Sequence, residues 1–413
     1  MASPGARRGR RALLAPGLAP VLRGGKGGPG AMAEGGGGRG RPGRWFQFGF
    51  RFGAPTESGL EPAPLGEAGT VRGVRPSWSF VGILTDGSVQ LLLRGATEAA
   101  AAAALPKDCL DVLPSETHLL VLREAALEGW PVPGSSSSSS SGALLEGEPA
   151  WRRELRPEDA AAAATATGPR GHPPGLPLVP GGFVAPRPPF FTPLPATLQA
   201  RQLALGHEHA LLLSAGGALF SWGGGRHGQL GHGDLESRPE PQPVEALQGV
   251  PSVEVAAGGW HSAALGETGD LYLWGWNESG QLALPSKTLS EDQAATRTAE
   301  AGRGDSEQNL DQQEVVQDTH QATFISIQAF PALVEMPHGE EISKISCGSR
   351  HTAAVTCTGH LYTWGRGKYG QLGHQETASS DEPRRVCYFV DRNLCIVDVV
   401  CGPWTTYALA VDR

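Results

Sequence analysis

The chain repeats one short module three times without a gap, and an internal repeat constrains a fold more than any other sequence feature. The copies begin at Gly206, Gly258 and Gly348. In each copy a histidine lies 3 residues after the leading glycine, a Trp-Gly pair begins 16 residues after it, and a Gly-Gln-Leu begins 22 residues after it. The first two leading glycines are 52 residues apart, which fits the length of one propeller blade. We therefore expect an all-β chain in which each copy forms one blade of a β-propeller.

Within each copy the pattern is strand, turn and strand. In the third copy a run at 351–356 precedes a Thr-Gly turn, and an aromatic run that includes Trp364 follows it. Short hydrophobic runs joined by glycine turns are typical of β-hairpins, and a closed ring of hairpins removes exposed sheet edges. We expect each repeated histidine to be hydrogen-bonded within its own blade and each tryptophan to pack between blades. The structural repeat residues are Gly206, His209, Trp222, Gly258, His261, Trp274, Gly348, His351, Trp364 and Gly402.

The two ends of the chain complement each other. Residue Gly402 leads a fourth copy, but the chain stops 11 residues later, before the strand that carries Trp-Gly. Residues 45–53 form an isolated aromatic and glycine-rich strand with no half-module before it. The N- and C-terminal strands are therefore predicted to pair and close the ring. A degraded copy has Leu92 in the tryptophan place, and the stretch between Val89 and Ala200 has room for one or two further units.

Low-complexity sequence surrounds and interrupts the repeats. Residues 1–44 contain nine basic residues and one acidic residue, and they are predicted to form a disordered basic segment, with a targeting peptide as the alternative. Residues 45–413 are predicted to form a single propeller domain with low-complexity, disordered insertions near 94–186 and 285–323. The second insertion carries eight acidic and three basic residues. It either engages a basic partner, such as a histone tail, or serves as a spacer.

Composition and motifs argue against several classes of function. The net charge of −8 provides no basic field for nucleic-acid binding, and no apolar run is long enough to span a membrane. Equivalent histidines in successive blades cannot converge on one ion, and the six cysteines include no Cys-x-x-Cys pair. Signatures of a catalytic nucleophile and of a phosphate-binding loop are missing. We therefore predict that the protein is not an enzyme and that it has no catalytic, cofactor-binding or metal-binding residue.

The residues after each Trp-Gly differ between the copies. Variable loops on a fixed frame are how repeat folds build binding surfaces, and aromatic and arginine side chains are favoured interface anchors. We expect these loops to share one face of the ring and to bind a protein partner, with ordinary solvated turns as the alternative. The candidate partner-binding residues are Arg226, His227, Trp276, Asn277, Arg366, Lys368 and Tyr369.

The unit Gly-x-x-His-Ser/Thr, followed by Leu-Tyr/Phe-x-Trp-Gly-x-x-x-x-Gly-Gln-Leu-Gly, closely resembles the repeat of the regulator of chromosome condensation family. It is most complete at 348–373. The resemblance is strong over 205–413 and weak over 45–92, and the whole chain is similar to family members that contain little beyond the propeller. The resemblance implies seven blades and a monomeric propeller that works within a complex.

The resemblance also implies a function. It points to a nuclear, chromosome-associated adaptor, with a cytoplasmic fraction allowed, that binds histones or a chromatin-modifying enzyme. Such an adaptor would support regulation of histone modification, transcription or chromosome segregation, without sequence-specific nucleic-acid binding and without a membrane. The alternatives are guanine-nucleotide exchange on a small GTPase and a cytoskeletal or trafficking scaffold. A shared fold does not decide between them.

Overall fold

Each gapless copy of the module folds as the middle of a four-stranded antiparallel sheet. In the third copy, β23 (His351–Thr356) pairs with β24 (Leu361–Gly365) across the Thr-Gly turn, and every residue of β23 is buried. The inner strand β22 (Ile342–Cys347) and the outer strand β25 (Ser380–Arg385) complete the sheet. The module sequence is therefore the buried hairpin of a blade.

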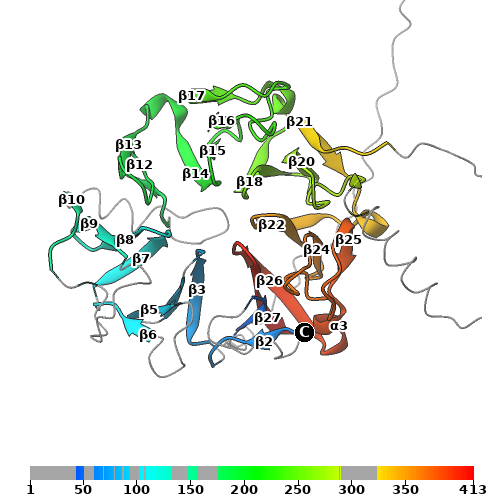
Figure 1. The fold of residues 1–413 in the computed structure, drawn as a ribbon, viewed down its shortest axis with the longest axis horizontal. Helices are drawn as coiled ribbons and strands as arrows, with labels where there is room; N and C mark the ends of the chain where they lie inside the picture. Colours follow the sequence, from blue (N-terminus) through cyan, green and yellow to red (C-terminus); the bar gives the residue numbers. More distant parts are fainter. Residues whose placement is uncertain are drawn as a thin grey trace, which may run out of the picture. The chain divides into compact units, whose positions relative to one another are not determined.

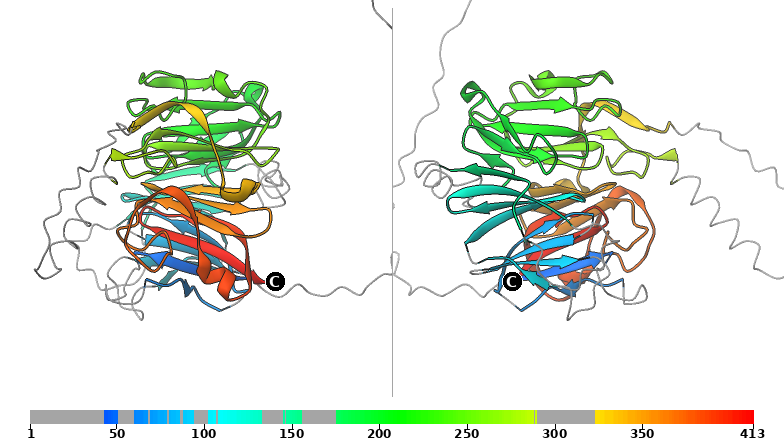
Figure 2. Two further views of the ribbon diagram at one scale, coloured as in Figure 1. Left: turned by 90° about the vertical axis from the view of Figure 1, so that its right-hand side faces the viewer. Right: turned by 60° about the vertical axis from the view of Figure 1, so that its left-hand side comes forward.

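The structure is a computed structural model. The residues that it describes are 43–50, 60–67, 69–78, 80–85, 88–93, 102–106, 108–132, 145, 147–155, 175–287, 289 and 323–413. These residues all lie within the unit 41–413. Seven sheets surround a common hub there (Figure 1), and their strands run between the two faces of the ring (Figure 2). The expected seven-bladed β-propeller is confirmed.

The blades follow the chain in order. We call the sheet that joins the two ends of the described chain the closing blade, and we number the other blades from one to six. The first blade contains β3 (Val71–Pro76), β4 (Phe80–Thr85), β5 (Ser88–Leu93) and β6 (Ala102–Ala104). The second blade contains β7 (Cys109–Pro114), β8 (His118–Arg123), β9 (Ala126–Pro131) and β10 (Trp151–Glu154). The third blade contains β11 (Leu178–Val179), β12 (Gly182–Val184) and β13 (Phe191–Pro193).

The fourth and fifth blades carry the first two copies of the module, and β22–β25 form the sixth. The fourth and fifth blades contain β14 (Ala200–Leu205), β15 (His209–Ser214), β16 (Leu219–Gly223) and β17 (Arg238–Pro243), then β18 (Ser252–Ala257), β19 (His261–Gly266), β20 (Leu271–Trp276) and β21 (Ile327–Val334). The described helices are short: η2 (Ala196–Leu198), η3 (Glu245–Leu247), η4 (Pro337–Gly339) and α3 (Cys387–Asp391).

The closing blade is built from both ends of the described chain. Strand β1 (Arg44–Gly49) pairs with β27 (Thr405–Asp412), and β2 (Ala63–Pro64) and β26 (Leu394–Cys401) flank that pair. Phe48 lies opposite Thr406 in the register, and the Phe50 N–H donates to the Trp404 carbonyl at 3.0 Å. The predicted closure of the ring by N- and C-terminal strands is therefore confirmed.

The structure differs from the sequence prediction in the N-terminal half. The sequence predicts an insertion near 94–186, but this stretch holds the second blade and part of the third. These blades lack the Gly-x-x-His and Trp-Gly signals, and ordinary apolar packing around Leu119, Val121 and Trp130 replaces them in the second blade. Within the predicted insertion, Ala102–Ala104 form β6 of the first blade. Residues 1–42 of the predicted basic segment 1–44 lie outside the described residues. Residues 290–322 of the predicted insertion 285–323 also lie outside them.

The repeated histidines connect neighbouring blades. His261 Nε2 lies 3.0 Å from the Thr352 hydroxyl of the next blade, and that hydroxyl donates to the Gln281 carbonyl at 2.7 Å. Because a hydroxyl has one proton to give, the histidine must donate from Nε2. The Trp364 indole N–H donates to the same carbonyl at 3.0 Å. We call this set of contacts the interblade relay.

The histidine, hydroxyl and carbonyl contacts of the interblade relay occur at three junctions, and the indole contact occurs at two of them. His209 meets Ser262 at 2.9 Å, and His351 meets Thr406 at 3.0 Å. The expectation of hydrogen bonds within one blade is therefore wrong, because each bond crosses to the next blade. Burial lowers the pKa of His209 to about 4 and the pKa values of His261 and His351 to about 3.

The relay also explains the leading glycine of the module. A Cβ atom at Gly348 would lie 2.1 Å from Cε1 of His351, and the equivalent distances at Gly206 and Gly258 are 2.3 and 2.4 Å. The imidazole ring therefore packs directly on the glycine Cα. Trp274 and Trp364 are fully buried between blades, whereas Trp222 is half-buried and packs on Phe183 at 5.7 Å.

Candidate functional site

The loops before each repeated histidine and after each Trp-Gly meet on one face of the ring. They meet because β19 and β20 are antiparallel, with His261 opposite Gly275. Trp260 and Trp276 consequently touch edge to face, with ring centroids 5.4 Å apart. His227 of the preceding blade lies 5.2 Å from the Trp276 ring. The fifth blade thus presents a small aromatic cluster to solvent.

An arginine pair extends this cluster toward the closing blade. The Arg350 guanidinium lies 4.5 Å from the centroid of the Trp276 ring and donates to Glu278 at 2.9 Å. The backbone N–H of Arg366 donates to the Arg350 carbonyl at 2.8 Å, and the Arg366 guanidinium lies 5.8 Å from the centroid of the Trp404 ring. The arginines therefore bridge two groups of aromatic rings.

The second group of rings lies at the closing blade. Trp404 contacts Trp78 at 5.2 Å and Tyr369 at 5.4 Å, and Tyr369 contacts Phe50 at 6.1 Å. These four rings surround a small hollow of about 90 Å³, which we call the closing-blade hollow. We call the whole surface the aromatic–arginine face; its residues are Phe50, Trp78, His207, His227, Trp260, Trp276, Arg350, Arg366, Tyr369 and Trp404.

A larger cavity opens at the hub beside this face. Its volume is about 490 Å³, and its lining includes Trp78, Trp222, Trp260 and the leading glycines of the modules. Both acidic and basic side chains contribute, among them Glu208 and Arg187. The cavity is a mixed apolar and polar depression, which is the kind of surface that receives protein segments.

The predicted loop residues have different environments. Arg226 is exposed and pairs with Glu208 at 3.0 Å, while Lys368 and Tyr369 are exposed. Asn277 is fully buried: its amide donates to the carbonyls of Leu284 and Ile325, and its oxygen accepts from the Leu282 N–H. Asn277 therefore holds its loop in shape and is not available to a partner.

The sequence pattern does not single out six of the ten residues of the face. Trp260 and Arg350 each come directly before a repeated histidine. Trp404 comes directly before Thr405, which stands in the place of that histidine. Phe50 follows Gly49 just as Trp276 follows Gly275. Variation at the residue before the histidine was a usable signal, since this residue changes while its neighbours repeat.

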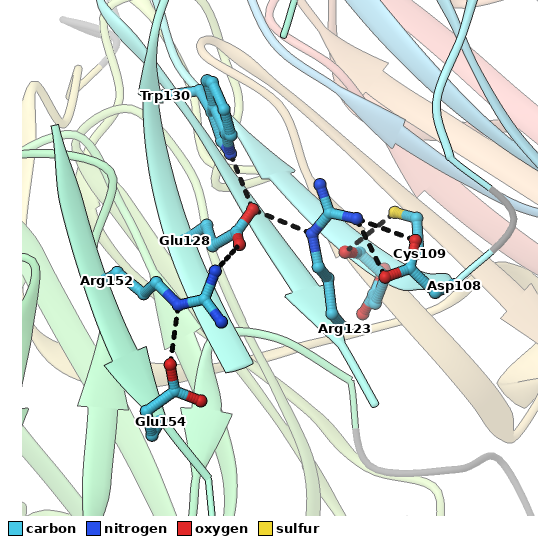
Figure 3. Close-up of polar contacts among 8 residues, drawn as sticks. Asp108, Cys109, Arg123, Glu128, Trp130, Arg152 and Glu154 are labelled. Carbon is cyan, nitrogen blue, oxygen red and sulfur yellow. Dashed lines mark hydrogen bonds and ion pairs between the residues drawn. The ribbon is translucent and has the colours of Figure 1, made fainter. Parts of the chain in front are cut away.

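A second polar cluster lies in the second blade (Figure 3). The buried Glu128 accepts hydrogen bonds from Arg123 at 2.8 Å, from Arg152 at 3.0 Å and from the Trp130 indole at 3.0 Å. Burial raises the pKa of the neighbouring Cys109 thiol to about 12, so this thiol is protonated at neutral pH and is a poor nucleophile. The charges are paired with each other, and the cluster stabilises the blade.

The described part of the chain offers no group of three His, Cys, Asp or Glu side chains arranged to hold a metal ion. None of its helices has the length and apolar character needed to cross a membrane. The aromatic–arginine face and the hub cavity beside it bring half-exposed aromatic rings, arginines and a hollow together on one side of the ring.

Seven blades around a hub, built in part from one repeated module, define a repeat β-propeller. The model of the regulator of chromosome condensation (RCC1) repeat matches residues 216–265 and 358–409, and a second model of this repeat matches 253–281 and 342–371. The RCC1 domain-containing protein 1 of Homo sapiens is 48% identical over 396 residues, covering 90% of this chain and 98% of that protein. The chain belongs to the RCC1 repeat family.

Two further comparisons fit this family. The Ultraviolet-B receptor UVR8 of Arabidopsis thaliana is 37% identical over 228 residues, which cover 54% of this chain and 42% of the receptor. The crystal structure of Prp20p from Saccharomyces cerevisiae, a protein with binding properties to Gsp1p and histones, has a TM-score of 0.59 at 17% identity and covers 90% of this chain and 92% of that one. This structural likeness concerns the fold.

Proposed function

We propose that this protein is a non-enzymatic adaptor of chromatin, located in the nucleus on chromosomes, that binds a histone or a chromatin-modifying enzyme through its aromatic–arginine face. In that role it would support regulation of histone modification, transcription or chromosome segregation. The observation that carries the proposal is the concentration of half-exposed tryptophan, tyrosine and arginine side chains on one face of a rigid ring. These residue types supply most of the binding energy in protein interfaces.

The face is also preorganised for binding. Its rings hold one another in edge-to-face contacts, and Arg350 is fixed between Trp276 and Glu278. Side chains that are already ordered lose little conformational entropy when a partner binds. The family context supports a nuclear role, since histones are among the ligands of the structurally similar Prp20p.

A pull-down from nuclear extract tests the proposal. The bait is the full chain, compared with Trp276→Ala on the face and with Leu333→Ala on the outer strand β21, where Leu333 is 56% exposed. We expect histones or a chromatin-modifying enzyme to be captured by the wild type and by Leu333→Ala, and to be depleted with Trp276→Ala. Capture of only cytosolic or vesicle proteins by the wild type contradicts the chromatin role, and imaging of the tagged chain outside the nucleus contradicts the location.

Guanine-nucleotide exchange on a small GTPase is the second candidate. The observation in its favour is the fold shared with Prp20p, which has binding properties to Gsp1p. A nucleotide-release assay over a panel of small GTPases separates the two candidates. Release accelerated by micromolar protein supports exchange, and flat traces reject it.

A further inference from the structure

The closing-blade hollow lies at a junction where the interblade relay is missing. At the closing blade, Thr405 lies opposite Gly49, in the register place that His261 occupies opposite Gly275. In the first blade, Val81 lies opposite Leu92, in the place that Ser262 occupies opposite Trp274. A threonine is smaller than a histidine, and a valine has no hydroxyl to receive a ring N–H. The junction thus lacks the imidazole that fills the three relay junctions.

The lining of the hollow is largely aromatic. Phe50, Trp78, Tyr369 and Trp404 line it together with Thr405, and its volume is about 90 Å³. This is the room of roughly three liquid waters, which is of the order of one small aliphatic side chain. Tyr369 is 39% exposed at the edge, so the hollow is reachable from solvent. It has the size and polarity of an anchor pocket.

A basic side chain beside the hollow has no acidic partner among the residues that the structure describes. The guanidinium of Arg366 faces Trp404, and among the described residues it has no hydrogen-bond acceptor, although its Nε is buried. Two other arginines differ, since Arg350 of this face is paired with Glu278, and Arg226, in the loop after the first Trp-Gly, is paired with Glu208. Lys368 is exposed close by in sequence. Since Nε itself is closed to solvent, an arriving carboxylate would be bound by the terminal nitrogens of the guanidinium, in a charge-assisted hydrogen bond.

The same arginine decides against a cationic ligand. Aromatic cages bind methylated ammonium groups through cation–π attraction, but here Arg366 already places a positive charge against the Trp404 ring. A second cation in the hollow would meet a like charge at short range. An apolar group with a neighbouring negative charge satisfies both the rings and the arginine.

We propose that the closing-blade hollow binds an acidic linear peptide segment of a partner protein, with one aliphatic side chain in the hollow and a neighbouring carboxylate on Arg366. This inference rests on the proposed function as a protein-binding adaptor and deepens it. It favours an acidic segment of a chromatin-modifying enzyme over a basic histone tail as the partner of this part of the face.

Selection from a random peptide library displayed on phage tests the proposal. The full chain is immobilised, and bound peptides are sequenced after elution. We expect enrichment of an aliphatic residue flanked by Asp or Glu. Enrichment of peptides rich in lysine or arginine, the charge that an aromatic cage would bind, overturns the proposal. The absence of any shared pattern also overturns it.

The enriched peptide is then measured by fluorescence anisotropy against matched variants of the full chain. Arg366→Glu should weaken binding by about tenfold or more. Arg226→Glu should leave binding unchanged, because Arg226 is exposed, lies in the loop after another Trp-Gly and is already paired with Glu208. A peptide with its acids replaced by lysine should bind Arg366→Glu better than the wild type, which a purely structural role of Arg366 would not produce. Equal effects of the two arginine variants overturn the proposal.

The nuclear pull-down separates this inference from the function on which it rests. If Arg366→Glu still captures nuclear partners that Trp276→Ala loses, the adaptor function stands and the closing-blade site is wrong. If the wild type captures none, the adaptor function itself fails, whatever peptide the hollow selects.

Discussion

The interblade relay makes the stability of the ring depend on pH. Each relay histidine is neutral in the folded protein, with a pKa of about 4 for His209 and about 3 for His261 and His351. In the unfolded chain a histidine has a pKa of about 6.5. As the pH falls below about 6.5, the unfolded chain therefore binds protons that the folded chain does not. The relay contribution is complete above this pH and is lost progressively down to the folded pKa values.

The magnitude follows from the pKa values. Between pH 7 and pH 5.5 each histidine costs about 1.3 kcal/mol of folding free energy, and the three together cost about 4 kcal/mol. Because pH 5.5 is more than one unit above all three folded pKa values, the result depends mainly on the unfolded pKa. This loss is a large part of the stability of an ordinary domain.

Urea unfolding followed by tryptophan fluorescence at the two pH values measures this loss. Comparison with His261→Gln isolates one relay, since glutamine does not titrate. The variant is expected to be less stable at pH 7 but to lose about 1.3 kcal/mol less than the wild type on acidification. An unchanged pH dependence in His261→Gln would refute the assignment of a buried neutral histidine.

Other consequences concern packing and charge. Gly348→Ala places a Cβ 2.1 Å from the His351 ring and should lower the free energy of unfolding by about 1–3 kcal/mol, as measured by urea unfolding. Glu128→Gln leaves Arg123 without its buried carboxylate and should cost about 2–3 kcal/mol in the same assay. The Cys109 thiol, with a pKa of about 12, should resist iodoacetamide at pH 8 while the two exposed cysteines react, as read by mass spectrometry.

Matched control variants test whether these losses come from the contacts named above. A Cβ at Gly73 meets only the end of a flexible arginine at 3.7 Å, so Gly73→Ala should be close to neutral. Glu154 is 68% exposed, so Glu154→Gln should change stability by less than about 0.5 kcal/mol. Equal losses in a variant and its control would show that the contacts named above do not set stability. Rapid alkylation of Cys109 in the folded chain would contradict its burial.

The parts of the fold that repeat could be predicted from the sequence. Fixed offsets between Gly348, His351 and Trp364 reflect contacts that every such blade makes, so a pattern search finds them. Ring closure could be predicted because an unfinished module at one end and an orphan aromatic strand at the other are complementary. The second and third blades could not, since apolar packing there replaces the repeated hydrogen bonds and leaves no fixed offset.

The candidate site was only partly predictable for a related reason. Loop residues after Trp-Gly were identified by their variation, which located Trp276 and Tyr369. Sequence alone does not show that Asn277 turns inward to satisfy three backbone groups. It also does not show that Trp78 and Trp404, which are 326 positions apart in the chain, touch at 5.2 Å once the ring closes.

Site-specific photo-crosslinking in cells tests most directly whether the aromatic–arginine face is the binding surface. A photoreactive phenylalanine replaces Tyr369 on the face or, as a control, Leu333 on the outer rim; both positions are exposed. We expect nuclear partners to be cross-linked from position 369 and not from position 333. Cross-links to such partners from position 333 alone would contradict the assignment of the face.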